Sequence, residues 1–420
     1  MIKETIPYGR QLIEEDDVAA VAAVLRSDFL TQGPAVEAFE GALCAYTGAA
    51  FAVCFSSGTA ALHAAYHAAG ITREDELITT PITFAATANA ALYVGARPVF
   101  ADVEPDTGNV DATLVEGVLT SRTKAVVPVH YAGHPVDMEK LSTFARSRGL
   151  IVIEDACHAI GAQYKAGPRN EIRGTMKELT HTSLLEPRSS NLEPRTSSQS
   201  EDWFRVGACA HSDMTAFSFH PVKQITTGEG GAVLTNNPEY YERLLRFRTH
   251  GITKDHFSRE PDGDWYYEMQ FLGFNYRMTD LQAALGTSQL AKLDRFVQRR
   301  CEIAARYDSA FAENPWFDIP VERGYARSSV HLYPIRLKQG PRERRKEIFR
   351  AMRDAGLGVQ VHYIPVYLQP YYQGLGYASG LCPMAEDFYS REISIPLYPG
   401  LTDQQVELVI DRLKEVLGAV

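Results

Sequence analysis

The chain has 420 residues, of which 45% are hydrophobic and 22% are charged, as is typical of a folded protein with its own apolar core. This length predicts two or three domains. Lysine and arginine number 42 and aspartate and glutamate 52, so the formal net charge is −10. An acidic balance argues against a general binder of nucleic acid or of anionic membranes, and it leaves room for a local basic pocket.

The six cysteines lie far apart and form no C-x-x-C pair. We therefore expect no zinc ribbon, redox motif or other metal site, and we interpret the several cysteines that lie inside apolar runs as buried free thiols. The stretch MIKETIPYGRQLIEEDD lacks the apolar region of a signal peptide, and no run reaches ~18 apolar residues. We expect a cytoplasmic protein that does not bind membranes.

In chain order, the first predicted element is an amphipathic helix from Glu14 to Arg26, with Val18, Val21 and Leu25 on one face. Short apolar runs then alternate with helix-like segments, which include residues 56–70 and 84–95. This rhythm predicts an α/β fold with a mostly parallel sheet covered by helices. The predicted strands are FAVCF (51–55), ELITT (76–80), RPVFADV (97–103), KAVVPVHY (124–131), GLIVIEDA (149–156), MTAFSFH (214–220) and GGAVLTN (230–236).

A long helix is predicted from Thr279 to about Glu313, and a smaller α+β unit follows. Its predicted strands are HLYPIRL (331–337), GVQVHY (358–363) and REISIPL (391–397), and its helices cover 342–356 and 402–419. The pattern predicts a large domain over 1–250 and a small one over 251–420. The alternation of strands and helices is interrupted by residues 168–202, which are rich in Ser, Thr, Glu, Arg and Pro. This composition predicts a loop-like insertion.

The segment Ser56-Ser57-Gly58-Thr59 lies between a predicted strand and a predicted helix. Free backbone amides at a helix start, together with hydroxyl groups, suit a phosphate. A serine N-cap followed by a glycine for close packing explains the same residues without a ligand.

The segment Glu154-Asp155-Ala156-Cys157-His158 ends a predicted buried strand, where open α/β sheets bind their ligands. An acid at this place can pair with a positively charged ring nitrogen, and His158 can hydrogen-bond or stack. A helix-capping aspartate is the alternative interpretation.

Lys223 follows the strand that ends in Ser218-Phe219-His220, and the glycine-rich turn Gly228-Glu229-Gly230-Gly231 comes after it. A lysine that enters a pocket can lose its proton and attack a carbonyl group as a Schiff-base nucleophile. A lone lysine after a strand is otherwise a surface residue whose stem lies on apolar atoms.

The segment Asn275-Tyr276-Arg277-Met278-Thr279-Asp280 precedes the predicted long helix. Thr279 is a candidate N-cap, and Asn275 and Arg277 could reach a phosphate, also across a subunit interface. A simple cap with a surface arginine accounts for the segment equally well.

Together these motifs supply what pyridoxal phosphate chemistry requires. The aldehyde needs a lysine, the pyridinium nitrogen needs an anion, and the phosphate needs hydroxyls and a helix N-terminus. The chain resembles the sugar aminotransferases of the DegT/DnrJ/EryC1/StrS family, which are fold-type I enzymes, over nearly its whole length. The resemblance is carried by SSGTAALHAA, TTPITFAATANA, VIEDACHAIGA, FSFHPVKQITTGEGGAVLTN and FNYRMTDLQAALG.

The resemblance implies pyridoxal 5'-phosphate as the cofactor and gives each matching residue a role. Lys223 would form the Schiff base with the cofactor and shuttle a proton, and Asp155 would pair with the ring nitrogen. Phe84 and His158 would lie against the ring. The remaining implied contacts are Gly58, Thr59 and Ser218 to the phosphate, Asn275 from a neighbouring subunit of a homodimer, and Tyr8, His362 and Tyr363 to the substrate.

Within the family the chain most resembles members that serve pseudaminic acid biosynthesis. That resemblance implies transfer of an amino group from glutamate to the C4 ketone of a UDP-linked 4-keto-6-deoxy-HexNAc. The alternatives are another 3- or 4-keto sugar linked to dTDP or GDP, a sugar dehydratase, and a non-catalytic regulatory domain that binds the cofactor. Dehydratases replace the lysine by histidine, whereas this chain has Lys223, and no residues remain for a DNA-binding domain.

Overall fold

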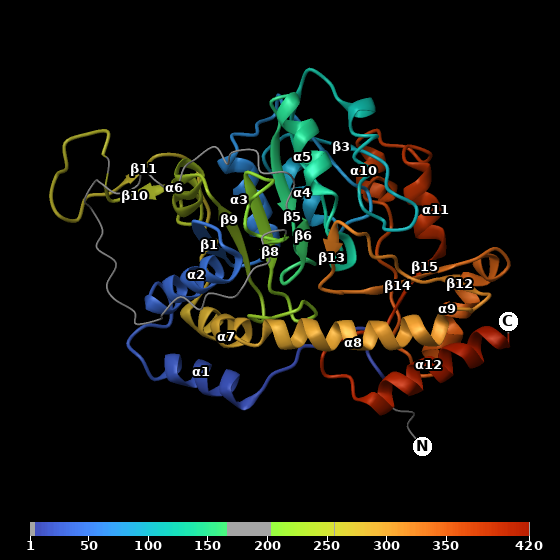
Figure 1. Ribbon diagram of the computed structural model, residues 1–420. Coiled ribbons are helices and arrows are strands. Elements are labelled where there is room, and N and C mark those ends of the chain that lie inside the picture. The colour runs from blue at the N-terminus through green and yellow to red at the C-terminus, as the bar shows by residue number, and fades with distance from the viewer. Residues whose placement is uncertain (1–4, 166–202, 256, 420) are drawn as a thin grey trace.

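The computed structural model describes residues 5–165, 203–255 and 257–419 of the chain (Figure 1). The insertion expected at 168–202 therefore lies outside the described residues. In the part of the chain that is described, no helix combines the length and the apolar character needed to cross a membrane. The same part contains no group of three or more His, Cys, Asp or Glu side chains arranged to hold a metal ion.

A seven-stranded sheet forms the centre of the protein, and it confirms the predicted α/β class. Strand β9 runs antiparallel to its two neighbours, whereas the other six strands are parallel to one another. In spatial order the strands are β1 (Phe51–Phe55), β9 (Gly231–Thr235), β8 (Met214–Ser218), β5 (Ile151–Asp155), β4 (Thr123–Val127), β2 (Glu76–Thr79) and β3 (Arg97–Phe100).

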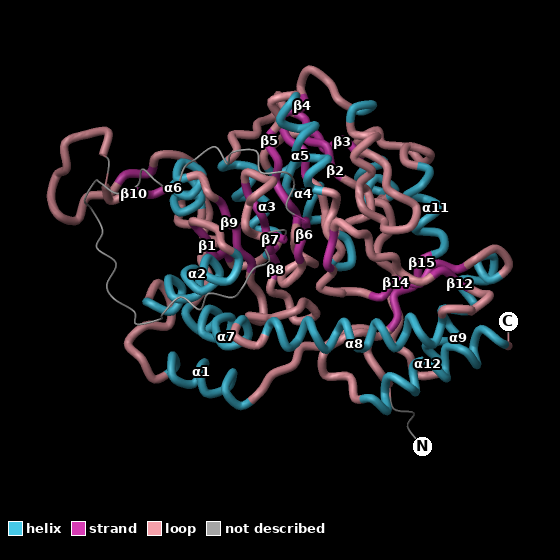
Figure 2. The backbone as a smooth tube through the Cα atoms, in the orientation of Figure 1, coloured by secondary structure: helices cyan, strands magenta, loops and turns pink. Residues whose placement is uncertain are grey.

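Helices cover both faces of this sheet, so its strands are buried on both sides (Figure 2). One face packs against α3 (Gly58–Ala68), α4 (Ala86–Tyr93) and α6 (Pro238–Phe247). The other packs against α2 (Pro34–Thr47), α5 (Met138–Ser147) and α7 (Asp280–Leu290). Successive side chains of a strand point to opposite faces. On β5, Val152 accordingly faces the α2 side, whereas Ile153 faces the α3 side.

The C-terminal part has its own apolar core around an antiparallel sheet of β12 (Phe317–Asp318), β14 (Tyr333–Leu337) and β15 (Glu392–Ile395). Its helices are α9 (Arg345–Asp354), α10 (Pro370–Gly374), α11 (Pro383–Arg391) and α12 (Asp403–Gly418). Helix α8 (Leu293–Phe311) runs along both parts, with its first turn in the core under the large sheet and its second half in the C-terminal core (Figure 1). The boundary near residue 250 stays a prediction.

Several further elements lie around these two parts of the chain. Strands β6 (Gln163–Lys165), β7 (Trp203–Arg205) and β13 (Ala326–Arg327) form a sheet that joins the two parts of the chain. Strands β10 (Ile252–Thr253) and β11 (Glu268–Met269) pair antiparallel beside α6. Helix α1 (Glu15–Leu25) packs on α7.

The prediction of a single long helix from Thr279 to about Glu313 is wrong, because the chain forms two helices, α7 and α8, with a break at Ala291 and Lys292. No proline or glycine lies there. The Lys292 amide donates to the carbonyl of Gln289 (3.0 Å), which tightens the turn, and its ammonium group lies 2.7 Å from both Asp16 and Asp17 of α1. A long-range ion pair therefore accompanies the break.

One further expectation is confirmed and another is wrong. The predicted first helix is present as α1, but its apolar residues Val18 and Leu25 are more than half exposed, whereas Asp17 is buried and accepts from Gln289 (2.7 Å). The segment 358–363 is not a strand. It contributes one antiparallel bridge, between Gln360 and Ser394 of β15. An apolar pattern does not reveal which neighbour, if any, covers it, and this accounts both for the exposed face of α1 and for the wrong strand.

Asp280, the first residue of α7, caps the start of α2. Its carboxylate accepts from the amides of Gly33 (2.8 Å) and Ala35 (2.9 Å) and is almost fully buried. We expect Asp280→Ala to lower the free energy of unfolding by about 1–3 kcal/mol, because two amides lose their acceptor. Urea unfolding measures this loss. The matched control is Asp403→Ala, in the exposed first turn of α12, and equal losses in both variants would contradict the capping role.

Candidate active site

Lys223 lies in the loop between β8 and β9, where its amide donates to the carbonyl of His220 (2.9 Å) and closes a turn. The side chain is half-buried. Burial lowers the pKa of its ammonium group, with Cys157 and Asp155 acting in the opposite direction. A lysine that loses its proton more readily is a better nucleophile toward a carbonyl group.

Asp155 ends strand β5 and is buried. One carboxylate oxygen accepts from the hydroxyl of Thr87 (2.6 Å), and the other accepts from the amide of Cys157 (3.1 Å). Thr83 lies 2.7 Å from Thr87, hydroxyl to hydroxyl, so a chain of two hydroxyls leads to the carboxylate. The remaining lone pairs of Asp155 are free to face a positively charged group.

The start of α3 meets the ends of β8 and β9 in a cradle of small residues. Ser57 caps the helix by accepting from the amide of Ala60 (3.1 Å), which confirms the N-cap interpretation for that residue. A Cβ atom on Gly58 would lie 2.8 Å from that of Ser218, and one on Gly231 would lie 2.5 Å from the Ser57 carbonyl. First-turn amides have no intrahelical acceptor, so the cradle presents donors to an anion.

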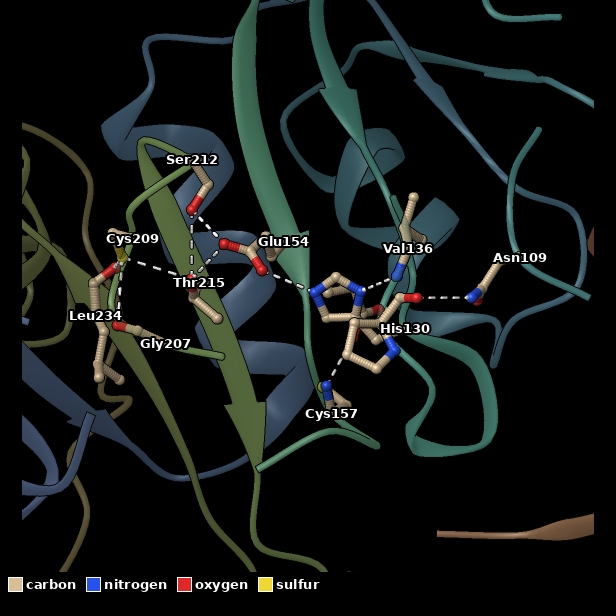
Figure 3. Close-up of polar contacts among 12 residues, drawn as sticks. Asn109, His130, Val136, Glu154, Cys157, Gly207, Cys209, Ser212, Thr215 and Leu234 are labelled. Carbon is tan, nitrogen blue, oxygen red and sulfur yellow. Dashed lines mark hydrogen bonds and ion pairs between the residues drawn. The ribbon is translucent and has the colours of Figure 1, made fainter. Parts of the chain in front are cut away.

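Glu154 lies directly beside Asp155 in sequence but on the opposite face of the sheet, at the centre of a buried polar network (Figure 3). Its carboxylate is 2.7 Å from Nε2 of His130, accepts from Thr215 (3.0 Å) and also accepts from Ser212. Burial raises the pKa of Glu154, but these hydrogen bonds outweigh it and hold the pKa below its ordinary value. The amide of Val136 donates to Nδ1 of His130 (3.1 Å), so Nε2 carries the ring proton and donates to Glu154.

His158 lies beyond Asp155 with its ring buried. Nε2 is 3.1 Å from the hydroxyl of Tyr363, and the ring centroid is 4.3 Å from that of His331. Burial, together with the nearby charge of Lys223, holds the pKa of His158 well below its ordinary value, so the ring is neutral. Its Nδ1 is buried and has no partner among the described residues. That orphaned atom is available to a ligand.

Phe84, Tyr8 and His362 border the same region. The Phe84 ring is 62% exposed and lies 6.2 Å from that of Tyr363, centroid to centroid. The N-terminal arm reaches the C-terminal part because the amide of Leu397 donates to the carbonyl of Tyr8 (3.0 Å). The Tyr8 ring is then 5.4 Å from that of His362. The expected substrate-contacting residues thus lie together.

Asn275 does not join this group through its side chain, which is exposed and makes no hydrogen bond to the described residues of its own chain. The neighbouring carbonyl of Tyr276 accepts from the amide of Ser56 (2.8 Å), so the segment borders the cradle through its backbone.

Four residues that bond the site residues were not among those predicted: Thr87, Gln224, Glu392 and Ser394. Thr87 lies within TTPITFAATANA, one of the motifs that carry the family resemblance, and this motif could have pointed to it. Its hydrogen bond to Asp155, however, depends on the fold. Gln224 donates to the carbonyl of His158 and to the hydroxyl of Ser329 (2.8 Å). Glu392 accepts from the amide of His362 (2.8 Å), and nothing in its apolar strand sequence predicted this contact.

A profile of the DegT/DnrJ/EryC1/StrS aminotransferase family matches residues 11–414. The chain belongs to this family. Two relatives are each 37% identical: the spore coat polysaccharide biosynthesis protein SpsC of Bacillus subtilis, over 98% of this chain and 97% of that protein, and a UDP-4-amino-4,6-dideoxy-N-acetyl-beta-L-altrosamine transaminase of Campylobacter jejuni, over 99% and 98%. The structure of Helicobacter pylori PseC, an aminotransferase involved in pseudoaminic acid biosynthesis, is 34% identical, with a TM-score of 0.83 over 99% of this chain and 100% of that one.

The protein is a pyridoxal-phosphate-dependent sugar aminotransferase, and the similar sugar aminotransferase Spr1654 of Streptococcus pneumoniae has been solved in PLP and PMP forms. The residues of this chain fit that cofactor. A half-buried lysine, a buried carboxylate, a cradle of small residues and the orphaned Nδ1 of His158 surround one region. An aminotransferase of this family takes an amino donor and a keto sugar as its substrates.

Glu392 gives the apoenzyme a specific pH dependence. Burial raises the pKa of its carboxyl group to about 8 from an ordinary value of 4.5. Between these values the folded chain holds a proton that the unfolded chain has lost. The free energy of unfolding is therefore highest below the ordinary pKa and falls as the pH rises toward 8, by about 1.4 kcal/mol per unit of pKa difference. We expect Glu392→Gln to remove this slope, so that the variant gains several kcal/mol relative to wild type between about pH 5 and about pH 8.

Urea unfolding of the apoenzyme across this pH range measures the difference. Glu347→Gln is the matched control, because Glu347 lies exposed in the first turn of α9. Its curve should run parallel to that of wild type. If the Glu392→Gln curve also ran parallel, the carboxyl group would not hold a proton in the folded state.

Proposed function

We propose that this aminotransferase moves an amino group from glutamate to the C4 ketone of a UDP-linked 4-keto-6-deoxy-HexNAc, as a step of pseudaminic acid biosynthesis. The observation that carries the aminotransferase chemistry is the convergence of Lys223 and Asp155 beside the cradle at the start of α3. The choice of sugar is supported by the likeness to the altrosamine transaminase and to PseC.

The bound cofactor supplies an electron sink for the carbon that gains or loses the amino group. We propose that Lys223 would hold the cofactor covalently and would then carry the proton between the reacting carbons. Asp155 would keep the ring nitrogen protonated, and Thr59 and Ser218 would hold the phosphate together with the amide of Gly58. Phe84 would cover one side of the ring, and His158 would lie near its hydroxyl or its other side. The substrate contacts are Tyr8, His362 and Tyr363.

The smallest active unit is proposed to be a homodimer in which Asn275 reaches the phosphate of the neighbouring subunit. Its exposed side chain has no partner among the described residues of its own chain, which suits that role. Large apolar side chains are exposed on α1 and the turn after it and near β11, and they would be buried by a second copy. These are Val18, Leu25, Phe29, Leu30, Trp265, Met269 and Leu272.

We expect Lys223→Ala to lower turnover by about a thousandfold or more, because no other group in the loop can replace the amine. The variant should keep its circular dichroism spectrum and bind the cofactor only reversibly. Borohydride fixes cofactor that is attached to lysine, so mass spectrometry after reduction should show the adduct in wild type alone. Lys223→Arg keeps the positive charge and controls for electrostatics. A borohydride-stable adduct in Lys223→Ala would contradict the role.

A panel of 4-keto sugars linked to UDP or dTDP, together with 3-keto and GDP-linked analogues, tests the substrate. We expect mass spectrometry to show amination of the UDP-4-keto-6-deoxy-HexNAc with glutamate as donor, with kcat/KM at least about tenfold above the other sugars. Faster amination of a dTDP- or GDP-linked sugar would favour a different sugar pathway. No amination of any sugar by a yellow, folded protein would favour a regulatory domain that binds the cofactor.

A further inference from the structure

Two buried polar residues of β15 lie behind His362 and have no place in the roles above. Glu392 and Ser394 are two positions apart, so their side chains share one face of the strand. Both are fully buried. A carboxyl group costs free energy to bury, and here the two polar residues alternate with the isoleucines Ile393 and Ile395, so the contacts of Glu392 need an explanation.

Glu392 holds His362 at two points. One carboxyl oxygen accepts from the backbone amide of His362 (2.8 Å), and the other is 2.5 Å from the hydroxyl of Ser394. That hydroxyl is in turn 2.9 Å from Nδ1 of the His362 ring. The three groups form a continuous line of hydrogen bonds from Glu392 to the imidazole. Nε2, at the far end of the line, has no hydrogen bond to the described residues.

The ionisation state of Glu392 determines which group donates and which accepts in each hydrogen bond between Glu392, Ser394 and His362. When the carboxyl group is ionised it only accepts, so Ser394 donates to Glu392, Nδ1–H of His362 donates to Ser394, and Nε2 carries a lone pair. When the carboxyl group is protonated it donates to Ser394, Ser394 donates to Nδ1, and Nε2 carries the ring proton. Nε2 of His362, at the far end of the line, therefore changes between acceptor and donor, and the imidazole stays neutral in both states.

We propose that Glu392, Ser394 and His362 form a proton relay that takes a proton from the ammonium group of the amino donor and returns one later in the cycle. This inference rests on the proposed function, because it requires an amino donor. An N–H bond of the ammonium group breaks, its electron pair stays on nitrogen, and the proton binds Nε2. The Nδ1 proton passes to Ser394, and the Ser394 proton passes to Glu392. A free amine and a neutral carboxyl group result, and charge is conserved.

The groups around the relay favour proton transfer through a neutral imidazole over the formation of a charged imidazolium. Burial and the charge of Lys223 lower the pKa of His362 to about 3, so an imidazolium is excluded near neutral pH. Burial raises the pKa of Glu392 to about 8, while the hydrogen bonds from Ser394 and the His362 amide and the charge of Arg345 of α9 act the other way. Tyr131 and Tyr363 also lie close to Glu392, and Arg336 of β14 is its strand neighbour. A relay poised near the working pH can both accept and donate.

The test follows the half-reaction of the holoenzyme with glutamate in a stopped-flow spectrometer from about pH 6 to about pH 10. Wild type should show an ionisation near pH 8 that raises the rate. Glu392→Gln and Ser394→Ala should lose this ionisation and react about 10- to 100-fold more slowly above it, with cofactor affinity unchanged. Ser394→Thr restores a hydroxyl and should restore the profile. Tyr131→Phe removes the hydroxyl that donates to the His362 carbonyl (2.6 Å) but no relay proton, and should keep the ionisation.

A second readout does not depend on activity. Nitrogen-15 NMR of the apoenzyme reports the tautomer of His362, which should change near pH 8 in wild type and stay fixed with the proton on Nε2 in Glu392→Gln. Wild-type ionisation and rate in a folded Ser394→Ala variant would overturn the relay. If Glu392→Gln does not fold, the Ser394→Ala and Ser394→Thr pair decides the question. A wild-type holoenzyme that does not react with glutamate would instead refute the proposed donor.

Discussion

Two neighbouring carboxylates at the end of β5 organise the site, because each is buried and each must be stabilised on a different face of the sheet. Glu154 is stabilised from within the protein, by His130, Ser212 and Thr215 (Figure 3). Asp155 accepts from the Thr87 hydroxyl and the Cys157 amide, so part of its hydrogen-bonding capacity remains for a ligand. Successive side chains of a strand point to opposite faces of the sheet. Glu154 therefore lies among protein groups that satisfy its carboxylate, whereas the carboxylate of Asp155 keeps hydrogen-bonding capacity for a ligand.

The segment that follows β4 links this strand end to the C-terminal part. The amide of His130 donates to the carbonyl of Asp155 (3.1 Å) while its ring bonds Glu154. The next residue, Tyr131, donates its hydroxyl to the carbonyl of His362 (2.6 Å). Gly133 follows with φ of 89°, and a Cβ atom there would lie 2.8 Å from the amide of His331. Only glycine permits this approach, which brings the two parts of the chain against each other at the site.

Much of the fold and part of the candidate site could be predicted from local patterns. The strands of the large sheet are continuous apolar runs, and such runs identify buried parallel strands directly. Lys223 and Asp155 could be singled out because each follows such a run, at the sheet edge where ligands bind. Thr87, Glu392 and Ser394 could not be found this way, because each acts through a partner far away in sequence or through a buried hydrogen bond. The break between α7 and α8 escaped for the same reason, since the partners of Lys292 lie in α1.

By itself the sequence determined the α/β class, the family and the inventory of reactive groups, because apolar periodicity and short motifs act over a few neighbouring residues. The tertiary structure alone decided which groups meet. It paired Thr87 with Asp155, set Glu392 behind His362, and left Val18 and Leu25 of α1 exposed. These outcomes depend on the packing of whole elements against each other, which fixes distances between residues hundreds of positions apart and determines which buried charge finds a partner.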